Sequence, residues 1–408
     1  MKNVNKICFF LNWVREIDMF KPISDKLKKK DIVFIINDLN KKLSKHNFER
    51  KKILDLLQKE NYEYNFLSNV INSIKFKTLL STADLPTSRL NITSLIKYIY
   101  GKTIGSIIQF FGLHFYLKKT FQREFIYGGT NASIYEDVYI EKKISEKTIK
   151  YPNGLDRNIK YFPNGKWKNV FDLFFTSSNF EKNLIKNKFL GKKVFNVGYN
   201  RFDDTHNKIN LNLIKEFQIN QNKKIILCCP NERIMFDQDK THISDFLNFL
   251  KFLSKNFNII LRPHPKLQFT KPDYFSLIKN SKLKLDLKQD RKIKDMFLIS
   301  DLILVDYGSS VLEAIYLKKK FMVYEWPQEK KFKVLFDKQN CLDYLVRNKV
   351  SESIINLKKK DNFLESINLL INDSKYQTKI NHLNDQYFGD QNKIENSLDL
   401  IKKIHYEE

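Results

Sequence analysis

The sequence predicts an α/β protein built from two Rossmann-like domains that face each other across a cleft. Three observations support this prediction. The chain has 408 residues, more than one hydrophobic core of ordinary size would hold. Short apolar runs alternate with amphipathic segments, a pattern typical of parallel sheets covered by helices on both faces. The alternation occurs twice along the chain, and the two halves meet near residues 190–200.

The N-terminal half holds the less regular of the two alternations. Residues 6–11 (KICFFL) and 31–36 (DIVFII) are typical of buried strands. Pro22 is expected to open a short helix over residues 22–29, because proline is favoured in the first turn of a helix. The other expected elements are a helix at 41–60, one or two helices within the apolar and basic stretch 91–121, and strands at 124–127, 147–151 and 171–176.

The C-terminal half repeats the pattern more clearly. Its expected strands are 224–229, 258–261, 282–287, 301–305 and 321–324, and its expected helices are 242–255, 274–279, 291–299 and 311–318. We place one domain at residues 1–193 and a second at 194–388. Residues 389–408 are expected to form a C-terminal helix that can pack back on the N-terminal domain.

The charge balance favours anionic partners only weakly. The chain has 72 Lys and Arg against 46 Asp and Glu, a net charge of +26 that would attract phosphates or an anionic surface. The lysines are spread along the whole chain, however, and Asn, Ile and Phe are also abundant, as an AT-rich genome would produce. Most aromatic residues lie within apolar runs and are better explained by core packing, so nucleic acid is not an expected partner.

Cysteine and histidine usage predicts neither a disulfide framework nor a metal site. The four cysteines lack a paired C-x-x-C spacing, and the seven histidines are scattered, so we expect no metal and no cofactor. The longest apolar stretch, residues 104–117, includes Gln109 and His114 and is too short to cross a bilayer. These features predict a cytoplasmic protein, or one attached peripherally to the inner face of the cell membrane.

Two short segments follow expected strands of the C-terminal half, at the edge of the sheet where ligands bind in folds of this kind. Asp306-Tyr307-Gly308-Ser309-Ser310 opens a helix, and its backbone N–H groups and hydroxyls would suit a phosphate. A simpler alternative is that Ser309 or Ser310 only caps the helix. Arg262-Pro263-His264-Pro265 carries an imidazole and a guanidinium on a loop stiffened by two prolines, an arrangement well made for a diphosphate.

The order of these segments resembles a known family. KKIILCCPNER, NIILRPHPKL and DLILVDYGSSVLEA look like the CDP-glycerol glycerophosphotransferase family of teichoic-acid and related surface-polymer synthesis, which has a GT-B-like fold. Upstream, VGYNRFD (residues 197–203) is similar to that family's Gly-x-Pro-Arg-x-Asp segment. Near the end, FGDQNKIENSLDLI is similar to its Asp-Gly-Lys-x-x-Glu-Arg helix start, with a poor match in the glycine and arginine. The resemblance covers roughly residues 150–405.

The resemblance implies roles for individual residues. A C-terminal, nucleotide-donor-binding domain would hold the donor diphosphate through Arg262, His264, Gly308, Ser309 and Ser310. The segment that contains Arg233 is similar to the family's Pro-Thr-x-Arg, so this arginine would also face the donor. Glu313, one turn into the helix after the serines, could hold a ribose hydroxyl. The simpler alternatives are a structural ion pair for Arg233 and Arg201, and an ordinary exposed helix position for Glu313. His264 would also act in catalysis.

Two departures from the family pattern bear on the reaction. The usual Asp-Tyr-Ser-Ser is one residue longer here because Gly308 is inserted, which leaves open which serine takes which role. Tyr151-Pro152-Asn153-Gly154-Leu155 looks like the family's Pro-His-Gly-Leu loop with its histidine, the proposed base, replaced by Asn153. An amide takes no proton at neutral pH, so a group such as Asp156 must serve as the base, or Asn153 acts by positioning alone, or the chemistry differs.

The sequence therefore predicts a transferase that moves glycerol phosphate, or a related polyol phosphate, from a CDP-activated donor to a hydroxyl of a glycan or lipid-linked polymer. Its N-terminal domain would serve the acceptor. A first alternative is a GT-B glycosyltransferase that uses a nucleotide sugar in capsule or lipopolysaccharide assembly. A second is a non-catalytic protein that binds membrane or nucleic acid on a degenerate transferase fold. The apolar and basic stretch 91–119 could lie on an anionic membrane, or could form core helices with solvated lysines.

Overall fold

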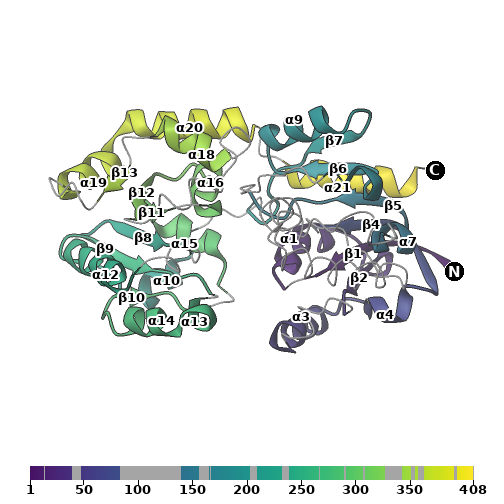
Figure 1. Cartoon of the computed structure of the whole chain (residues 1–408), viewed down its shortest axis with the longest axis horizontal. Helices are drawn as coiled ribbons and strands as arrows, with labels where there is room; N and C mark the ends of the chain where they lie inside the picture. Colours follow the sequence, from purple (N-terminus) through teal and green to yellow (C-terminus); the bar gives the residue numbers. More distant parts are fainter. Residues whose placement is uncertain are drawn as a thin grey trace, which may run out of the picture.

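Two parallel sheets organise the chain (Figure 1). The computed structural model describes residues 1–12, 14–38, 47–82, 139–155, 165, 167–202, 209–231, 239–265, 267–288, 291–306, 308–326, 342–350, 354–356, 363–389 and 393–407. The elements expected at 91–121 and 124–127 lie outside the described residues.

The first sheet has seven strands in the order β3-β2-β1-β4-β5-β6-β7. The order reverses between β1 and β4, because the chain first builds outward to β3 and then returns to the other side of β1. The sheet ends with β7, so the chain leaves it at Asn196, three residues beyond the predicted limit at 193. The elements of this unit are β1 (Lys2–Leu11), α1 (Arg15–Ser24), η1 (Lys29–Asp31), β2 (Ile32–Ile36), α3 (Asn47–Lys59), β3 (Tyr64–Phe66), α4 (Leu67–Val70), β4 (Ile74–Ser81), α7 (Ile140–Ile144), β5 (Ser145–Lys150), α8 (Trp167–Val170), β6 (Leu173–Thr176), α9 (Asn179–Lys188) and β7 (Lys193–Asn196).

The central strand β1 is buried on both faces, as its apolar run predicts. Alternate residues of a strand point to opposite faces. Ile7, Phe9 and Leu11 accordingly pack in one apolar cluster, and Cys8 and Phe10 pack in another on the other side of the sheet. Helices must therefore cover both faces, which is the layered arrangement that the alternation of the sequence predicts.

One prediction for this unit was wrong, and one strand beside β1 was not predicted. Pro22 does not open a helix but lies in the last turn of α1, where it cannot give the carbonyl of Asp18 the usual i→i−4 hydrogen bond. The strand β4, the direct neighbour of β1, was missed altogether. Its sequence IKFKTLLS places Lys75 and Lys77 in a half-buried first part and Thr78 in the buried second part, so it does not read as a continuous apolar run.

The second sheet has six strands in the order β10-β9-β8-β11-β12-β13, with the reversal between β8 and β11. Its strands β8, β9, β11 and β12 lie close to the expected ones, because each is a short, mainly apolar run, whereas β13 and several of the helices were not predicted. The elements are α10 (Leu211–Glu216), β8 (Ile225–Cys229), α12 (Lys240–Ser254), β9 (Asn258–Leu261), α13 (Leu267–Thr270), α14 (Pro272–Lys279), β10 (Lys284–Leu285), α15 (Ile293–Ile299), β11 (Leu302–Val305), α16 (Ser309–Tyr316), β12 (Phe321–Glu325), α18 (Leu342–Lys349), β13 (Ile354–Asn356), α19 (Phe363–Asn372) and α20 (Ser374–Tyr387).

The last helix, α21 (Lys393–Tyr406), returns to the first unit, where Figure 1 shows it beside β5 and β6. Leu398 and Ile401 join the apolar cluster of β1. Lys147 of β5 donates to the carbonyl of Ile404 at 2.9 Å. The first unit is thus assembled from both ends of the chain.

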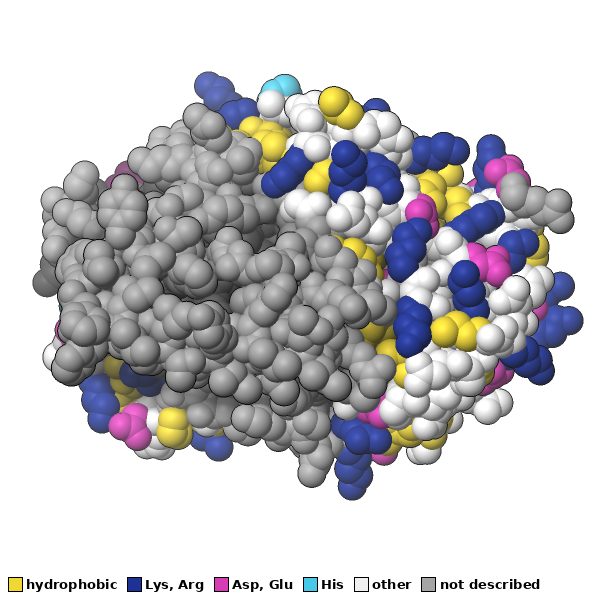
Figure 2. Space-filling model, turned by 45° about the vertical axis from the view of Figure 1, so that its right-hand side comes forward, with side chains coloured by type: hydrophobic (Ala, Val, Ile, Leu, Met, Phe, Trp, Pro, Cys, Tyr) yellow, Lys and Arg dark blue, Asp and Glu magenta, His cyan; other side chains and the backbone are white. Residues whose placement is uncertain are grey.

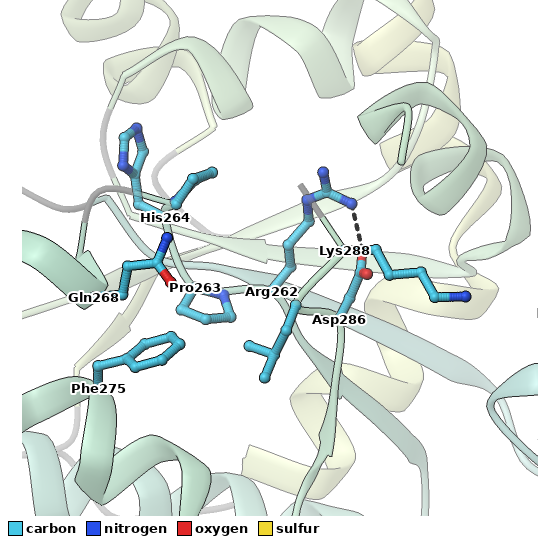
Figure 3. Close-up of a pocket in the computed structure, with 9 residues that line it drawn as sticks. Arg262, Pro263, His264, Gln268, Phe275, Asp286 and Lys288 are labelled. Carbon is cyan, nitrogen blue, oxygen red and sulfur yellow. Dashed lines mark hydrogen bonds and ion pairs between the residues drawn. The ribbon is translucent and has the colours of Figure 1, made fainter. Parts of the chain in front are cut away.

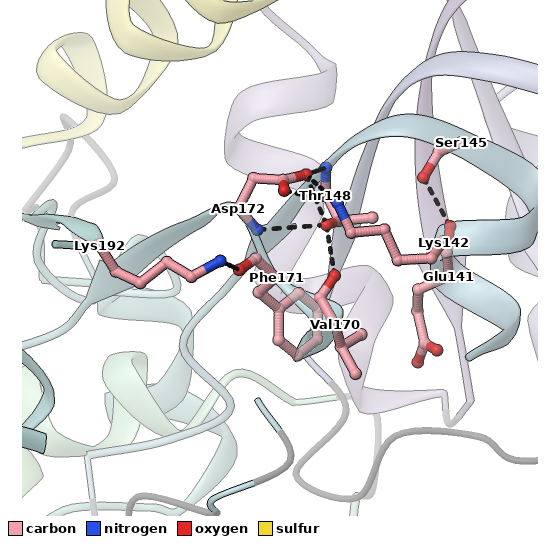
Figure 4. Close-up of polar contacts among 8 residues, drawn as sticks. All are labelled: Glu141, Lys142, Ser145, Thr148, Val170, Phe171, Asp172 and Lys192. Atoms are coloured by element: carbon pink, nitrogen blue, oxygen red, sulfur yellow. Dashed lines mark hydrogen bonds and ion pairs between the residues drawn. The ribbon is translucent and has the colours of Figure 1, made fainter. Parts of the chain in front are cut away.

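A polar network joins β5 and β6 near the start of β6 (Figure 4). Asp172 accepts hydrogen bonds from the backbone and hydroxyl of Thr148, at 2.9 Å and 3.0 Å, and forms an ion pair with Lys142. Burial raises the pKa of Asp172, but Lys142 and Thr148 lower it by more, so the net direction is downward. This network lies away from the carboxyl ends of the strands and holds the sheet together.

The basic side chains of the described residues are scattered over the face drawn in Figure 2, as they are along the sequence, with acidic side chains between them. Among the described residues, no helix is both long and apolar enough to cross a membrane.

Candidate active site

The expected donor residues lie at the carboxyl edge of the second sheet. Arg262 directly follows β9, and its backbone N–H donates to the carbonyl of Cys228 at 2.8 Å, so the loop leaves the sheet in register with β8. Gly308 and α16 follow β11, on the other side of β8. Since adjacent strands lie about 4.8 Å apart, β9 and β11 are about 10 Å apart, and the two segments follow them on either side of β8, next to the point where the strand order reverses.

The loop Arg262–Pro265 forms one wall of a small pocket (Figure 3). Pro263 is buried beneath it, while His264 is half-buried and its carbonyl accepts from Leu267, the first residue of α13. In Figure 3 the His264 imidazole points away from the loop and away from the Arg262 guanidinium. The full lining is Arg262, Pro263, His264, Pro265, Gln268, Phe275, Asp286, Leu287 and Lys288.

Arg262 is held by two groups that the sequence did not reveal. Its guanidinium forms an ion pair with Asp286, which follows β10, and donates to the carbonyl of Arg291 at 2.8 Å. Arg291 lies 3.5 Å from the other oxygen of Asp286. The side chains of Arg262, Asp286 and Arg291 are only 12%, 0% and 7% exposed, so this pairing is largely removed from water. Its geometry fixes the guanidinium at the sheet edge.

The network around Arg262 keeps a positive excess. Glu216 accepts from Arg291 at 2.5 Å and pairs with Lys288 at 2.8 Å. Lys288 and Arg291 together lower the pKa of Glu216, which therefore stays ionised. Three cations thus face two carboxylates, Asp286 and Glu216, and the remaining positive charge is available to an anion at the pocket.

The helix start after β11 does not have the geometry of an ordinary serine cap. The cap position of α16 is Gly308, and no side chain caps it. Its φ of 94° and ψ of −153° lie in a region that is essentially restricted to glycine. Ser309 and Ser310 occupy the first turn instead, so the alternative that one of them caps the helix is wrong. Their hydroxyls and the first N–H groups of α16 lie at one helix end.

Asp306 fixes the backbone that leads into this turn through hydrogen bonds to neighbouring strand ends. It is 1% exposed and accepts from the backbone N–H of Asn231, which follows β8, and from the indole of Trp326, which follows β12, each at 2.9 Å. One carboxylate thus ties together the ends of three neighbouring strands and fixes the approach to Gly308.

Glu313 and Arg201 form part of the junction between the two units. Glu313 is 5% exposed, so the alternative of an ordinary exposed helix position is wrong. Burial lowers the pKa of the Arg201 guanidinium, but Tyr199, Glu313 and Asp18 raise it by more. Arg201 lies 4.0 Å from Asp18 of α1, and so it stands between the acidic side chains of both units. The structure favours the ion-pair interpretation for Arg201.

The loop that contains Asn153 follows β5 of the first unit and packs against the second unit. Tyr151 packs in the cluster of the first sheet, while Leu155 belongs to the cluster of the second unit. The Tyr151 hydroxyl accepts from Asn200 of the connecting segment. Asn153 is half-buried between these two anchors, at the carboxyl end of β5. Asp156 and Arg233, the other expected site residues, lie outside the described residues.

Comparison with known proteins decides the family. Residues 151–400, more than half of the chain, match the family model CDP-Glycerol:Poly(glycerophosphate) glycerophosphotransferase. The chain belongs to this family. The predicted resemblance is thereby confirmed.

One curated relative of this glycerophosphotransferase family member is the teichoic acid poly(glycerol phosphate) polymerase of Bacillus spizizenii. The two are 25% identical over 169 residues, which are 39% of this chain and 41% of the relative. The matched region therefore spans about two fifths of the length of that polymerase.

Solved structures confirm the predicted GT-B-like fold. The wall teichoic acid polymerase TagF superimposes with a TM-score of 0.58 at 14% identity, covering 99% of this chain and 89% of that one. A UDP-N-acetylglucosamine 2-epimerase from Listeria monocytogenes gives a TM-score of 0.54 at 12% identity, covering 99% and 97%. At these identities the likeness concerns the fold alone. Among the described residues, no group of His, Cys, Asp and Glu is arranged to hold a metal ion.

Proposed function

We propose that this glycerophosphotransferase moves glycerol phosphate, or a related polyol phosphate, from a CDP-activated donor to a hydroxyl of a cell-surface glycan or lipid-linked polymer. The observation that carries the proposal is the family match over residues 151–400, which includes both segments at the edge of the second sheet. A TagF variant of the same fold was studied after a soak with CDP-glycerol, which supports this class of donor.

The second unit would hold the donor diphosphate. His264 and the first turn of α16, with Gly308, Ser309 and Ser310, supply donors from two sides of β8. Arg262, fixed by Asp286, adds positive charge to this edge, and Arg233 would join it. Glu313 would accept from a ribose hydroxyl. These groups stabilise the negative charge that develops on the leaving CMP.

The chemistry is an in-line displacement at the β-phosphorus. The acceptor hydroxyl oxygen forms the new bond to phosphorus, and the bond from phosphorus to the bridging oxygen breaks. CMP leaves with that electron pair, and His264 stabilises the charge on it. On the acceptor side, Asn153 orients the acceptor hydroxyl by hydrogen bonds. The proton of that hydroxyl goes to Asp156, three residues after Asn153 in the sequence.

Calorimetric titration tests the donor assignment. We expect wild-type protein to bind CDP-glycerol and CDP more tightly than UDP and UDP-sugars, and His264→Ala to weaken CDP-glycerol binding about tenfold or more. His382→Ala, which changes an exposed histidine on α20, is the matched control and should bind as the wild type does. Equal binding by both variants would remove His264 from the donor site.

A second candidate is a glycosyltransferase that uses a nucleotide sugar. Asn153 in place of the family's histidine favours it, because the acceptor side then lacks the expected base. The same titration separates the two candidates, since preference for uridine nucleotides over cytidine nucleotides would establish the glycosyltransferase instead.

Contact with an anionic membrane is a separate part of the proposal. The apolar and basic stretch 91–119, which lies outside the described residues, would suit a lipid-linked acceptor. Replacing Lys97, Lys102, Lys118 and Lys119 with Glu should abolish sedimentation with vesicles of anionic phospholipid. Unchanged sedimentation would refute membrane contact through this stretch.

A further inference from the structure

A pair of buried amides marks the carboxyl edge of the first sheet. Asn12 directly follows β1 and Asn37 directly follows β2, and the backbone N–H of Asn37 donates to the carbonyl of Leu11 at 2.9 Å. In this sheet the strand order reverses between β1 and β4. In open α/β sheets such a reversal leaves a crevice at the carboxyl ends of the strands, where ligands bind.

Among the described residues, each amide of this pair uses only one of its two polar atoms in a hydrogen bond. Asn37 Nδ2 donates to Asn12 Oδ1 at 2.8 Å. Within the described part of the chain, Asn12 Nδ2 and Asn37 Oδ1 have no hydrogen-bond partner, although the two residues are only 6% and 1% exposed. Exchanging nitrogen and oxygen in both amides leaves the same result, one donor and one acceptor. Each such group costs about 1–3 kcal/mol when it is buried without a partner.

The groups around the two amides hold them in place through hydrogen bonds. The Glu16 carboxylate accepts from the backbone N–H of Asn12 through one oxygen and from the Thr82 hydroxyl through the other. Because Thr82 directly follows β4, Glu16 ties the ends of β1 and β4 together across the reversal. The two amides themselves are uncharged, so they match a neutral polar group better than a phosphate.

We propose that Asn12 and Asn37 bind one hydroxyl of the polyol end of the acceptor. A hydroxyl is both donor and acceptor, and so it completes the pair: its oxygen accepts from Asn12 Nδ2 and its proton is donated to Asn37 Oδ1. This inference rests on the proposed function, in which the acceptor carries a hydroxyl that attacks the donor. The bound hydroxyl positions the adjacent one, which is the nucleophile.

The test is direct binding measured by ligand-detected NMR without any donor. The probes are glycerophosphoglycerol and an analogue in which 1,3-propanediol replaces both glycerols, which removes the secondary hydroxyl from each end. We expect the wild type to bind glycerophosphoglycerol about tenfold more tightly than the analogue, as for one neutral hydrogen-bonded group. Asn12→Ala and Asn37→Ala should bind both probes equally.

A matched control separates this site from general damage to the fold. Asn258 is 4% exposed, and its amide bonds to the backbone of Asn220 and Lys223 in the other unit. Asn258→Ala should therefore keep the tenfold preference. Equal binding of the two probes by the wild type overturns the proposal without any variant, and so does a preference that survives in folded Asn37→Ala. Failure to turn over CDP-glycerol would refute the proposed donor but would leave this probe comparison intact.

Discussion

The carboxyl edges of the two sheets occupy equivalent places in their units but offer different groups to a ligand. The edge of the second sheet is charged, with Arg262, Asp286 and Arg291 in a largely buried network. The edge of the first sheet also holds the buried charges of Glu16 and Lys150, but its polar atoms without a partner among the described residues include the uncharged amide atoms of Asn12 and Asn37. A diphosphate needs compensation of charge, whereas a hydroxyl needs one donor and one acceptor. The difference between the edges therefore parallels the difference between donor and acceptor.

The largest expected effect comes from breaking the charged edge. Asp286→Ala leaves Arg262 and Arg291 buried without their carboxylate, which should reduce the free energy of unfolding by about 3–5 kcal/mol. CDP-glycerol binding should also weaken, because the guanidinium of Arg262 loses its fixed position. Chemical denaturation and calorimetry measure the two effects.

Asp301→Ala is the matched control for this variant. Asp301 pairs with Lys224, whose side chain is 56% exposed, and accepts from the backbone of Ile225. Its loss should cost less stability and leave CDP-glycerol binding unchanged. Equal losses of stability and of CDP-glycerol binding in the two variants would show that neither property depends specifically on the buried charges at the edge of the second sheet.

A smaller effect distinguishes the glycines of the two edges. Gly308→Ala forces a side chain into φ 94° and should cost about 1–3 kcal/mol, with a higher KM for the donor as the start of α16 shifts. Gly154→Ala, in the loop after β5, is the comparison, because among the described residues beyond its chain neighbours no heavy atom lies within 4 Å of the added Cβ, and its φ is not in the left-handed region. Thermal unfolding and donor kinetics of both variants test this. Equal loss in the two would contradict the assignment of Gly308 as a conformational requirement.

The sequence predicted the edge of the second sheet better than that of the first, for a physical reason. Arg262–Pro265 and Asp306–Ser310 are contiguous, and each follows an apolar run, so type and position can both be inferred from local sequence. Asp286 and Arg291 belong to other segments and meet Arg262 only through the pairing of β9 and β10. Asn12 and Asn37 are single residues 25 positions apart. Only the parallel pairing of β1 and β2, which sets strand ends side by side, brings them together.

The fold was predictable to a similar degree. In the second sheet, the strands β8, β9, β11 and β12 were expected from short, mainly apolar runs, whereas β13 and the helices α10, α13, α18, α19 and α20 were not predicted. In the first sheet, β4 was not predicted because its lysines and the buried Thr78 interrupt the apolar run that is typical of a central strand. The helix α1 was misplaced because Pro22 was taken as a start signal, although it lies in the last turn. Tertiary burial overrides both local signals.

Restoring the family's histidine would sharpen the comparison from the acceptor side. Asn153→His adds a group that can take a proton at neutral pH, so we expect kcat to rise about tenfold and to gain a pH dependence near 6.5. Asn72→His, at an exposed position before β4 and hence at the opposite edge of the sheet, controls for an added imidazole. An unchanged pH profile for Asn153→His would mean that position 153 does not face the attacking hydroxyl.

The smallest expected effect concerns how the two units respond to acid. His405 of α21 is buried in the first unit, with its Nδ1 3.0 Å from the Thr78 hydroxyl. Burial lowers the pKa of His405, Lys77 and Lys147 lower it further, and Asp31 opposes them, so the net direction is downward. The unfolded chain therefore binds this proton more readily than the folded one. The stability of the first unit should be full above about pH 6.5 and should fall as the pH drops below that value, because the protonated imidazole cannot stay buried.

Thermal unfolding between pH 5 and pH 8 measures this dependence, and His405→Gln should flatten it. A slope of the same size in the variant would assign the acid sensitivity to other groups and would remove His405 as a difference between the two units.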